Sequence, residues 1–445
     1  MELELVIEKL SSDGKGIAHH DGAVVFVDKV CPQDKIRAKI VKQNKSFWIG
    51  ELVEILEKSP HRVKPFCPMH NVCGACNLQF IDYDYQLECK KEMVKDAFRG
   101  TDIEVKDVIP SPQIKEYRHK IQYPIRQTQV SKRILAGYFK PKSHDIVNIK
   151  YCPIQPAICD EIIDFVREIA PMYGIEGYDE KNHKGLLRHV VIRSSAKTGD
   201  NLVILVINSN KPNEKVKDFA LKLYDRFDKV TGIGVNINNK QTNLIMSDKT
   251  IILYGKEYIE EDLCGVTFKI GANTFFQVNP KSAENIFKYV KNHIKSNFNN
   301  PKILDAYAGI SAFGLVMADI AGKVVSVEEN KASVDLAKEV AAANRIKNIE
   351  LHCEDSEKFF EEISENTFDI TILDPPRKGC SEKTLEYALK LTKSQIIYVS
   401  CNPSTLARDL KYLTEHGGTV KDIQPFDMFC HTNHIENVAI ISLPS

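Results

Sequence analysis

The sequence predicts an α/β protein built from a small N-terminal β-barrel, a central α+β region and a C-terminal doubly wound parallel sheet. Short β-rich runs separated by glycine turns fill residues 1 to about 57, and apolar runs alternate with helical segments from about residue 266. A chain of 445 residues is long enough for two or three domains with ordinary cores. We therefore divide it into units at residues 1–58, 59–265 and 266–445.

The first unit has the pattern of a small barrel. Gly14 and Gly22 mark turns between its β-rich runs, and several lysines with Arg37 give it a basic side. Regular short strands of this kind are typical of oligonucleotide-binding barrels, although the same architecture also serves as a protein-binding module. The predicted strands lie at residues 3–7, 23–27, 35–41 and 48–55.

The last unit alternates strands and helices as a doubly wound sheet does. Its five parallel strands are predicted at residues 302–306, 323–327, 349–352, 368–373 and 395–399. A helix is predicted at 332–343, and late strands at 419–425 and 436–442 complete the sheet. Such sheets bind ligands beyond the carboxyl ends of their strands, so we expect the site in the loops that follow them.

Two of these loops favour S-adenosylmethionine as the ligand. The segment from Asp305 to Gly314 follows the first strand, but it is not the G-x-G-x-x-G fingerprint of nicotinamide dinucleotides. Glu328 ends the second strand, 23 residues after Asp305, where an acid can hydrogen-bond ribose hydroxyls. An acidic loop and a ribose-binding acid suit a ligand that carries a sulfonium and no phosphate. Asp374, followed by Pro375-Pro376-Arg377, ends the fourth strand, where substrate-binding loops are common.

Cys401 follows the fifth strand, at the position where open sheets place their ligands. Pro403 ends the strand, and Ser404 or Thr405 can cap the next helix. A thiol at this position can act as a nucleophile. The alternative is a buried, inert cysteine, since cysteine is among the most buried residue types.

The chain has 12 cysteines, and disulfides are rare in the cytosol, so metal binding becomes the better explanation for some of them. Cys67, Cys73 and Cys76 have the spacing C-x5-C-x2-C, which can wrap one metal centre. Four thiolates suit zinc or an iron–sulfur cluster, and the lack of a second C-x2-C favours [4Fe-4S]. The candidates for the fourth ligand are Cys89, Cys152 and Cys159, of which Cys152 is followed by Pro153.

The composition, 43% hydrophobic and 27% charged with zero net charge, is that of a soluble globular chain. No apolar run reaches the length of a membrane span and the N-terminus lacks a signal-peptide pattern, so we expect a cytoplasmic protein. Residues 111–150 hold nine Lys or Arg against two Asp or Glu, with aromatic residues among them. That mixture suits contact with an RNA backbone and its bases, and a solvated basic face is the alternative.

Four motifs occur in an order that closely resembles the RNA uracil-C5 methyltransferases, which make 5-methyluridine. They are Phe275–Asn279, Asp374–Arg377, Ser400-Cys401-Asn402-Pro403 and His434–Asn437. The stretches Gly14–Ala18 and Val24–Val27 resemble the TRAM domain, an RNA-binding barrel. Together with the cysteines, they make the chain similar to the branch that contains the bacterial 23S ribosomal RNA enzymes. The resemblance covers essentially the whole chain.

The resemblance implies a class I methyltransferase fold for the last unit and a role for each matched residue. Cys401 would be the nucleophile and Glu436 the base. S-adenosylmethionine and active-site contacts would come from Gln277, Tyr307, Glu328 and Asp374, and a [4Fe-4S] cluster would be held by Cys67, Cys73, Cys76 and Cys152.

The sequence therefore predicts methylation of uridine C5 in RNA, with 23S rRNA favoured, through a covalent bond from Cys401 to C6. A transfer-RNA substrate, a cytosine-C5 methyltransferase and a non-catalytic iron–sulfur RNA-binding protein are the alternatives. No obligate protein partner and no membrane are predicted.

Overall fold

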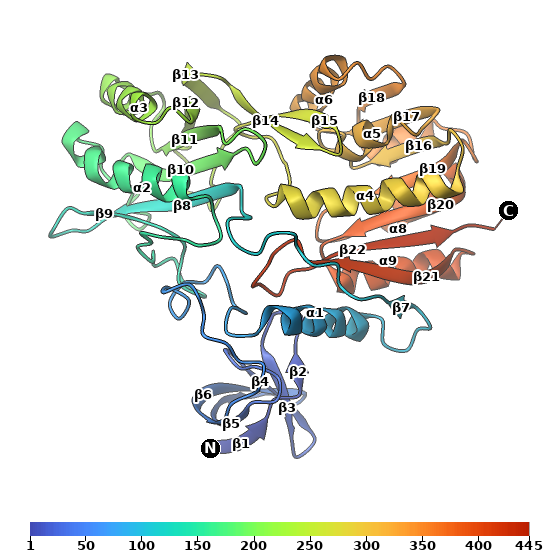
Figure 1. The fold of residues 1–445 in the computed structure, drawn as a ribbon, viewed down its shortest axis with the longest axis horizontal. Helices are drawn as coiled ribbons and strands as arrows, with labels where there is room; N and C mark the ends of the chain where they lie inside the picture. Colours follow the sequence, from blue (N-terminus) through green and yellow to red (C-terminus); the bar gives the residue numbers. More distant parts are fainter. Residues whose placement is uncertain (445) are drawn as a thin grey trace.

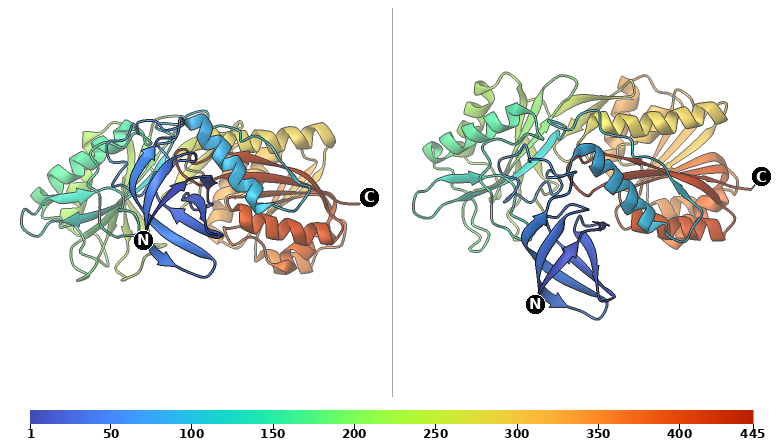
Figure 2. Two further views of the ribbon diagram at one scale, coloured as in Figure 1. Left: turned by 90° about the horizontal axis from the view of Figure 1, so that it is seen from below. Right: turned by 60° about the horizontal axis from the view of Figure 1, so that its bottom comes forward.

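The computed structural model describes residues 1–444, which form three parts that follow one another along the chain. Figure 1 shows the N-terminal barrel below helix α1 (Tyr83–Ala97), the central sheet to the left and the C-terminal sheet to the right. In the views of Figure 2 the barrel again lies against α1, at one side of the two larger parts.

The N-terminal barrel is a sheet with the strand order β1-β5-β6-β4-β3-β2. Its core is small and aliphatic, with Val25, Val27 and Ile36 fully buried. The four predicted strands are present, and the prediction missed β2 and β3, which flank the Gly14 turn. The strands are β1 (Glu2–Val6), β2 (Lys9–Leu10), β3 (Gly16–His20), β4 (Ala23–Val27), β5 (Lys35–Gln43) and β6 (Phe47–Glu57).

The central part is a sheet with the order β13-β12-β11-β10-β8-β9, and its apolar core lies against α2 and α3. The antiparallel hairpin β14–β15 leaves this sheet and leads towards the C-terminal part. The elements are β8 (Lys120–Gln127), β9 (Ile134–Ala136), α2 (Ala157–Ile169), η1 (Ala170–Tyr173), β10 (Leu187–Ser194), β11 (Asn201–Ile207), α3 (Glu214–Arg226), β12 (Val230–Ile237), β13 (Thr250–Gly255), β14 (Tyr258–Leu263) and β15 (Val266–Gly271).

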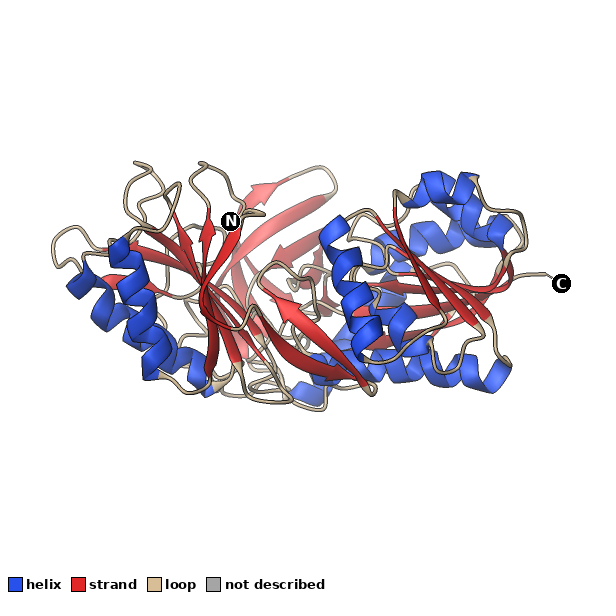
Figure 3. Cartoon of the chain, turned by 90° about the horizontal axis from the view of Figure 1, so that it is seen from above, coloured by secondary structure: helices blue, strands red, loops and turns tan. Residues whose placement is uncertain are grey.

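The C-terminal part is a sheet with the order β18-β17-β16-β19-β20-β22-β21-β7, and helices cover both of its faces (Figure 3). Neighbouring residues of one strand face opposite layers: Ile303 packs with α4 and α5, whereas Leu304 packs with α8 and α9. The strands are β16 (Lys302–Ala306), β17 (Lys323–Glu328), β18 (Ile349–Cys353), β19 (Phe368–Leu373), β20 (Thr392–Ser400), β21 (Thr419–Phe426) and β22 (Glu436–Ser442). The helices are α4 (Pro280–Asn297), α5 (Ala312–Met317), α6 (Lys331–Ala343), α7 (Ser356–Glu361), α8 (Glu382–Leu391) and α9 (Pro403–Glu415).

Part of the segment that we assigned to the central unit packs on the C-terminal sheet instead. Strand β7 (Glu104–Val105) pairs with β21, and Val94 of α1 packs in the same apolar cluster as Leu410 of α9. The boundary predicted at residue 265 therefore does not describe how residues 83–105 pack. A two-residue strand is too short to show a periodic sequence pattern. Helix α1 is also separated from α9, with which it packs, by more than 300 residues of sequence.

A buried ion pair fixes α1 to the segment that precedes β22. The Lys90 Nζ donates to Asp427 Oδ1 at 2.6 Å, and both side chains are almost fully buried. The second oxygen of Asp427 accepts a hydrogen bond from the Tyr83 hydroxyl at 2.7 Å. All the charge placed in this interface is thus compensated, as a buried ion requires.

Among residues 1–444 there is no helix with the length and hydropathy that crossing a bilayer requires.

We expect Lys90→Met to lower the free energy of unfolding by about 3–5 kcal/mol, because it leaves Asp427 buried without a counter-charge. Urea unfolding followed by circular dichroism measures this. Lys331→Met is the matched control, since Lys331 forms an exposed ion pair with Asp335 on α6 and should leave the urea midpoint unchanged. An equal loss in both variants would contradict the role assigned to the buried pair.

Candidate active site

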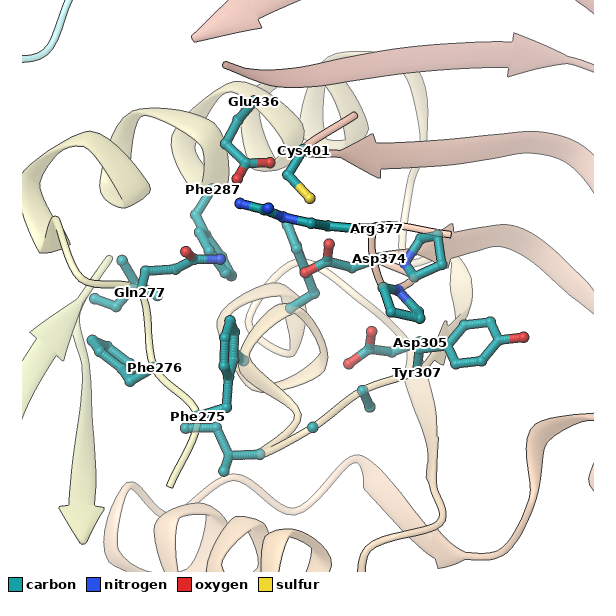
Figure 4. Close-up of a pocket in the computed structure, with 18 of the residues that line it drawn as sticks. Phe275, Phe276, Gln277, Phe287, Asp305, Tyr307, Asp374, Arg377, Cys401 and Glu436 are labelled. Atoms are coloured by element: carbon teal, nitrogen blue, oxygen red, sulfur yellow. The ribbon is translucent and has the colours of Figure 1, made fainter. Parts of the chain in front are cut away.

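A cavity of about 400 Å³ opens at the carboxyl ends of β16, β19 and β20. Five of the predicted residues line it: Gln277, Tyr307, Asp374, Cys401 and Glu436. Figure 4 shows that they come from separate segments of the chain. The position agrees with the rule that doubly wound sheets bind ligands beyond their carboxyl edge.

The thiol of Cys401 is held at the end of β20 by the turn that follows it. Asn402 caps α9, its side chain accepting a hydrogen bond from the Ser404 N–H at 3.1 Å. The Asn402 amide also donates to the Arg377 carbonyl at 3.1 Å, and the Thr405 hydroxyl donates to the same oxygen at 3.2 Å. These bonds tie the loop after β19 to the thiol, so Cys401 and Arg377 keep a fixed relation.

Glu436 reaches the cavity because β22 runs antiparallel to β20. The register pairs Ser400 with Asn437, which sets Glu436 beside Cys401. Only 7% of Glu436 is exposed, and this burial raises the pKa of its carboxyl to about 8, with a further rise from Asp374 and an opposing effect from Arg377.

Arg377 is the cation that balances the carboxyls around the thiol. Figure 4 shows its guanidinium beside both the Cys401 sulfur and the Glu436 carboxyl. Burial raises the pKa of the Cys401 thiol and the charge of Glu436 adds to it, while Arg377 lowers it through charge and a hydrogen bond. The sequence motif contains Arg377, but our prediction gave it no role.

Two further carboxyls lie at the floor of the cavity. Burial raises the pKa of Asp374 to about 7, helped by repulsion from Asp305. Burial also raises the pKa of Asp305 to about 7, although Gly314, Ser326 and Ser311 donate hydrogen bonds to it. Carboxyls gathered in this way favour a ligand that brings positive charge.

Glu328 does not line this cavity but an adjoining one of about 690 Å³, whose wall also includes Tyr307 and Asp374. Its two carboxylate oxygens accept hydrogen bonds from the N–H groups of Gly309 and Asn330, both at 2.9 Å. Tyr307 has a positive φ of 58°, and its hydroxyl lies 2.9 Å from the Thr384 hydroxyl oxygen. The two cavities share Tyr307, Asp374 and Pro376, so they adjoin at the loops that follow β16 and β19.

Aromatic side chains form the wall opposite the acids. Phe275 is 69% exposed at the mouth, whereas Phe287 and Phe313 stack beneath it with ring centroids 4.1 Å apart. Phe429 and His434 also line the cavity. Our prediction assigned none of these five a role: Phe275 and His434 lie in recognised motifs, and the other three have only the apolar periodicity of core residues.

The four cysteines predicted to hold a cluster approach one another at the edge of the central part. Cys73, Cys76 and Cys152 belong to one packed cluster, and the charge of Cys67 adds to the burial that raises the pKa values of Cys76 and Cys152. Cys89 and Cys159 pack elsewhere, in other apolar clusters. Within residues 1–444, no group of three or more His, Cys, Asp or Glu side chains converges as the ligands of a single metal ion do.

Five parallel strands followed by an antiparallel pair, with a ligand site at the carboxyl edge, define a class I methyltransferase fold. Residues 82–442 match the family described as tRNA (uracil-5-)-methyltransferase, and residues 1–53 match the TRAM domain. The chain therefore belongs to the RNA uracil-5 methyltransferase family and carries an N-terminal TRAM domain. Both resemblances predicted from the motifs are confirmed.

Similar proteins agree with this assignment over the full length. An uncharacterized RNA methyltransferase of Halalkalibacterium halodurans is 36% identical, over 99% of this chain and 97% of its own. One from Oceanobacillus iheyensis is 35% identical, over 99% and 96%. The crystal structure of the Pyrococcus abyssi tRNA (uracil-54, C5)-methyltransferase with S-adenosyl-L-homocysteine superposes with a TM-score of 0.79 at 29% identity, covering 98% of this chain and 99% of that one.

The sequence predicts that Glu436 is the base, and a base must be ionised to accept a proton. Because the raised pKa keeps Glu436 protonated below about 8, we expect kcat/KM to fall as the pH drops below that value. Arg377→Ala removes the charge that lowers the pKa values of Glu436 and Cys401, so the fall should begin at a higher pH. A pH–rate profile tests this. Arg345→Ala, an exposed arginine outside the cavity, is the control, and an unchanged profile in Arg377→Ala would count against the assignment.

Proposed function

We propose that this protein transfers a methyl group from S-adenosylmethionine to C5 of a uridine in RNA, through a covalent intermediate on Cys401. The observation that carries the proposal is that Cys401 and Glu436 line one cavity with the Arg377 guanidinium beside both. S-adenosylmethionine supplies an electrophilic methyl group. The protein must then supply a nucleophile, a group that accepts a proton, and a pocket for a nucleobase that has left its stack.

Uracil C5 is a weak nucleophile until a thiolate adds to C6. Bond formation from the Cys401 sulfur to C6 moves the C5=C6 electron pair into an enolate, which makes C5 reactive towards the methyl group. C5 then attacks the methyl carbon, the bond from that carbon to the sulfonium sulfur breaks, and S-adenosylhomocysteine leaves. Glu436 next takes the proton from C5, and those electrons rebuild the C5=C6 double bond as the Cys401 thiolate leaves. A base that lies inside a stack cannot be attacked at C6, so an unpaired or flipped uridine is the substrate.

The acidic and the aromatic residues of the cavity suit different ligands. We assign Asp374, Tyr307, Gln277 and Glu328 to S-adenosylmethionine, with Glu328 at the ribose end because it lines the adjoining space. The exposed ring of Phe275 at the mouth suits stacking on a nucleobase. A cytosine-C5 enzyme and a non-catalytic scaffold are less well supported, because the family is named for uracil and both reacting side chains are present.

The RNA that carries the target uridine is the finer part of the proposal. We favour 23S rRNA, because the chain combines the TRAM domain with the four-cysteine pattern that resembles the bacterial rRNA enzymes. A tRNA substrate is the second candidate, supported by the full-length likeness to the Pyrococcus abyssi tRNA enzyme. Covalent trapping on fragments of each RNA that contain 5-fluorouridine, which has no removable C5 proton, separates the two.

We expect Glu436→Gln to accumulate a denaturant-resistant protein–RNA complex that contains the transferred methyl group, because addition and transfer proceed but elimination does not. Cys401→Ala should form no complex and no 5-methyluridine. Gel electrophoresis with labelled methyl donor gives both readouts.

Cys353→Ala is the control, since Cys353 is an exposed thiol outside the cavity and its loss should change neither readout. A complex that persists in Cys401→Ala would place the nucleophile elsewhere. Turnover by Glu436→Gln at the wild-type rate would mean that another group removes the C5 proton.

We also propose that Cys67, Cys73, Cys76 and Cys152 hold a [4Fe-4S] cluster. Their mutual approach, beside backbone N–H groups of Met69, His70 and Ile154 that point at the sulfurs, fits thiolates bound to iron. A single ion needs its ligands to converge on one point, whereas each iron of a cluster takes its own thiolate. Cys89 and Cys159 are less suited because they pack apart from the other three.

Anaerobically purified protein should be brown and contain about four irons per chain. Cys152→Ala should lose this iron, and Cys159→Ala, a buried cysteine in a neighbouring core, should keep it. Metal analysis with the visible absorption spectrum tests both. One zinc and no iron would reject the cluster, and loss of iron in Cys159→Ala alone would mean that Cys152 is not the fourth ligand.

A further inference from the structure

A separate cavity, of about 430 Å³, lies in the central part and contributes nothing to the chemistry described above. Its walls come from β8, from the loop between β9 and α2, from the start of β10 and from residues 242–245. We call it the central cavity. The residues that matter for its chemistry are Arg118, Arg126, Tyr138, Tyr178, Arg188 and His189.

The central cavity is built to receive negative charge. Three arginines line it, whereas Glu180 is the one carboxylate among its lining residues. Glu180 is itself occupied at the rim, 3.0 Å from the His144 ring and 3.9 Å from Arg126. Burial and the nearby charge of Arg188 lower the pKa of His189 to about 4, so its ring is neutral and offers one donor and one acceptor.

Several polar atoms of its wall lack partners. Within residues 1–444, the Tyr138 hydroxyl, the Nδ1 of His189 and the Nε of Arg188 are buried without a hydrogen-bond partner. Arg188 is only 4% exposed. Its Nη1 donates to the carbonyls of Asn238 and Lys240 at 2.8 and 2.6 Å, and its Nη2 donates to the Thr242 carbonyl at 3.3 Å. Native proteins seldom leave several such groups unsatisfied in one place unless a ligand uses them.

Flat aromatic and guanidinium surfaces also line the central cavity. The Arg188 guanidinium lies over the Tyr178 ring, 4.5 Å from its centroid. Tyr138 packs edge-to-face on Tyr123 at 4.8 Å between centroids, and Phe139 stacks on His144 at 5.1 Å. Stacked planes combined with cations and unpaired polar atoms are what an unstacked nucleobase with its phosphate requires.

Arg118 links this cavity to the active site. It lines the central cavity, and its charge contributes to lowering the pKa of His434, which lines the active site. The next residue, His119, donates its backbone N–H to the Val278 carbonyl at 2.7 Å, directly after Gln277 of the active site. A strand of RNA whose target base occupies the active site can therefore reach the central cavity within a few nucleotides.

We propose that the central cavity holds a second extruded base of the RNA substrate, at a fixed position near the target uridine. The inference rests on the proposed function and extends it, because it makes recognition depend on a nucleotide that is not modified. Its volume is ample for one nucleoside, and its three arginines disfavour a cationic ligand. The neighbouring base is held by stacking and by the unpaired polar atoms, while Arg126 at the rim contacts its phosphate.

The test is a double-mutant cycle between the full-length enzyme and its RNA. Leu244 lines the rim and is 61% exposed, so Leu244→Trp narrows the cavity without disturbing the core. Leu221→Trp is the matched control, since Leu221 is an exposed leucine of α3 outside the cavity. Each enzyme is assayed with intact RNA and with RNAs in which one nucleotide near the target has been replaced by an abasic ribose.

At one position we expect the abasic substitution to raise the KM of the wild-type enzyme about tenfold, as the loss of one stacked base does. Leu244→Trp should raise the KM for intact RNA by a similar factor with kcat unchanged, and the abasic change should then add nothing further. Arg126→Ala should raise KM for the abasic and intact RNAs alike.

The proposal would be overturned if Leu244→Trp had the same KM as Leu221→Trp. It would also be overturned if the KM effects of Leu244→Trp and of the abasic nucleotide multiplied at every RNA position tested. An enzyme that makes no 5-methyluridine in any RNA would refute the proposed function instead, so the two failures are told apart. Circular dichroism of each variant establishes that the fold is retained, and Arg126→Ala supplies a second variant that removes a charge from the rim without narrowing the cavity.

Discussion

The burial of charge where α1 meets the segment before β22 is the constraint on which the rest of the active site depends. Lys90 and Asp427 are 337 residues apart in sequence, and each would be costly to bury without the other. The same segment accepts further bonds, from Ser282 of α4 to the Asp427 carbonyl and from Asn279 to the Met428 carbonyl. Hydrogen bonds from α1 and from the start of α4 thereby fix the segment of chain that leads to Glu436.

This arrangement explains why the carboxyl of Glu436, the proposed base, can lie at the start of an interior strand. Glu436 would gain nothing from burial on its own, and its raised pKa records the cost. That cost is met by the packing of β22 between β20 and β21, with Val438 and Ala439 fully enclosed. The register that satisfies those apolar residues also sets Glu436 beside Cys401, because a slip by one residue would turn its side chain to the other face.

Sequence reasoning located the parts of the site that follow directly from buried strands. The strands ending at Ala306, Leu373 and Ser400 are apolar and short, so their carboxyl ends, and with them Asp374 and Cys401, were predictable. The packing of α1 and β7 on the C-terminal sheet was not predictable, because contacts between segments so far apart in sequence leave no local sequence pattern. The role of Arg377 was also hidden, because its guanidinium acts on Cys401 and Glu436, which follow and begin other strands.

The charges of the site also couple ligand binding to the state of the base. Asp374 raises the pKa of Glu436, and Asp305 in turn raises the pKa of Asp374. The negative charge of one carboxylate thus favours the protonated form of its neighbour. Any cation bound beside Asp374 offsets this repulsion and lowers the pKa of Glu436. Linkage then requires that ionised Glu436 strengthen the binding of that cation. In the proposed mechanism, Glu436 would therefore be ionised when a positively charged donor is bound and protonated when it is not.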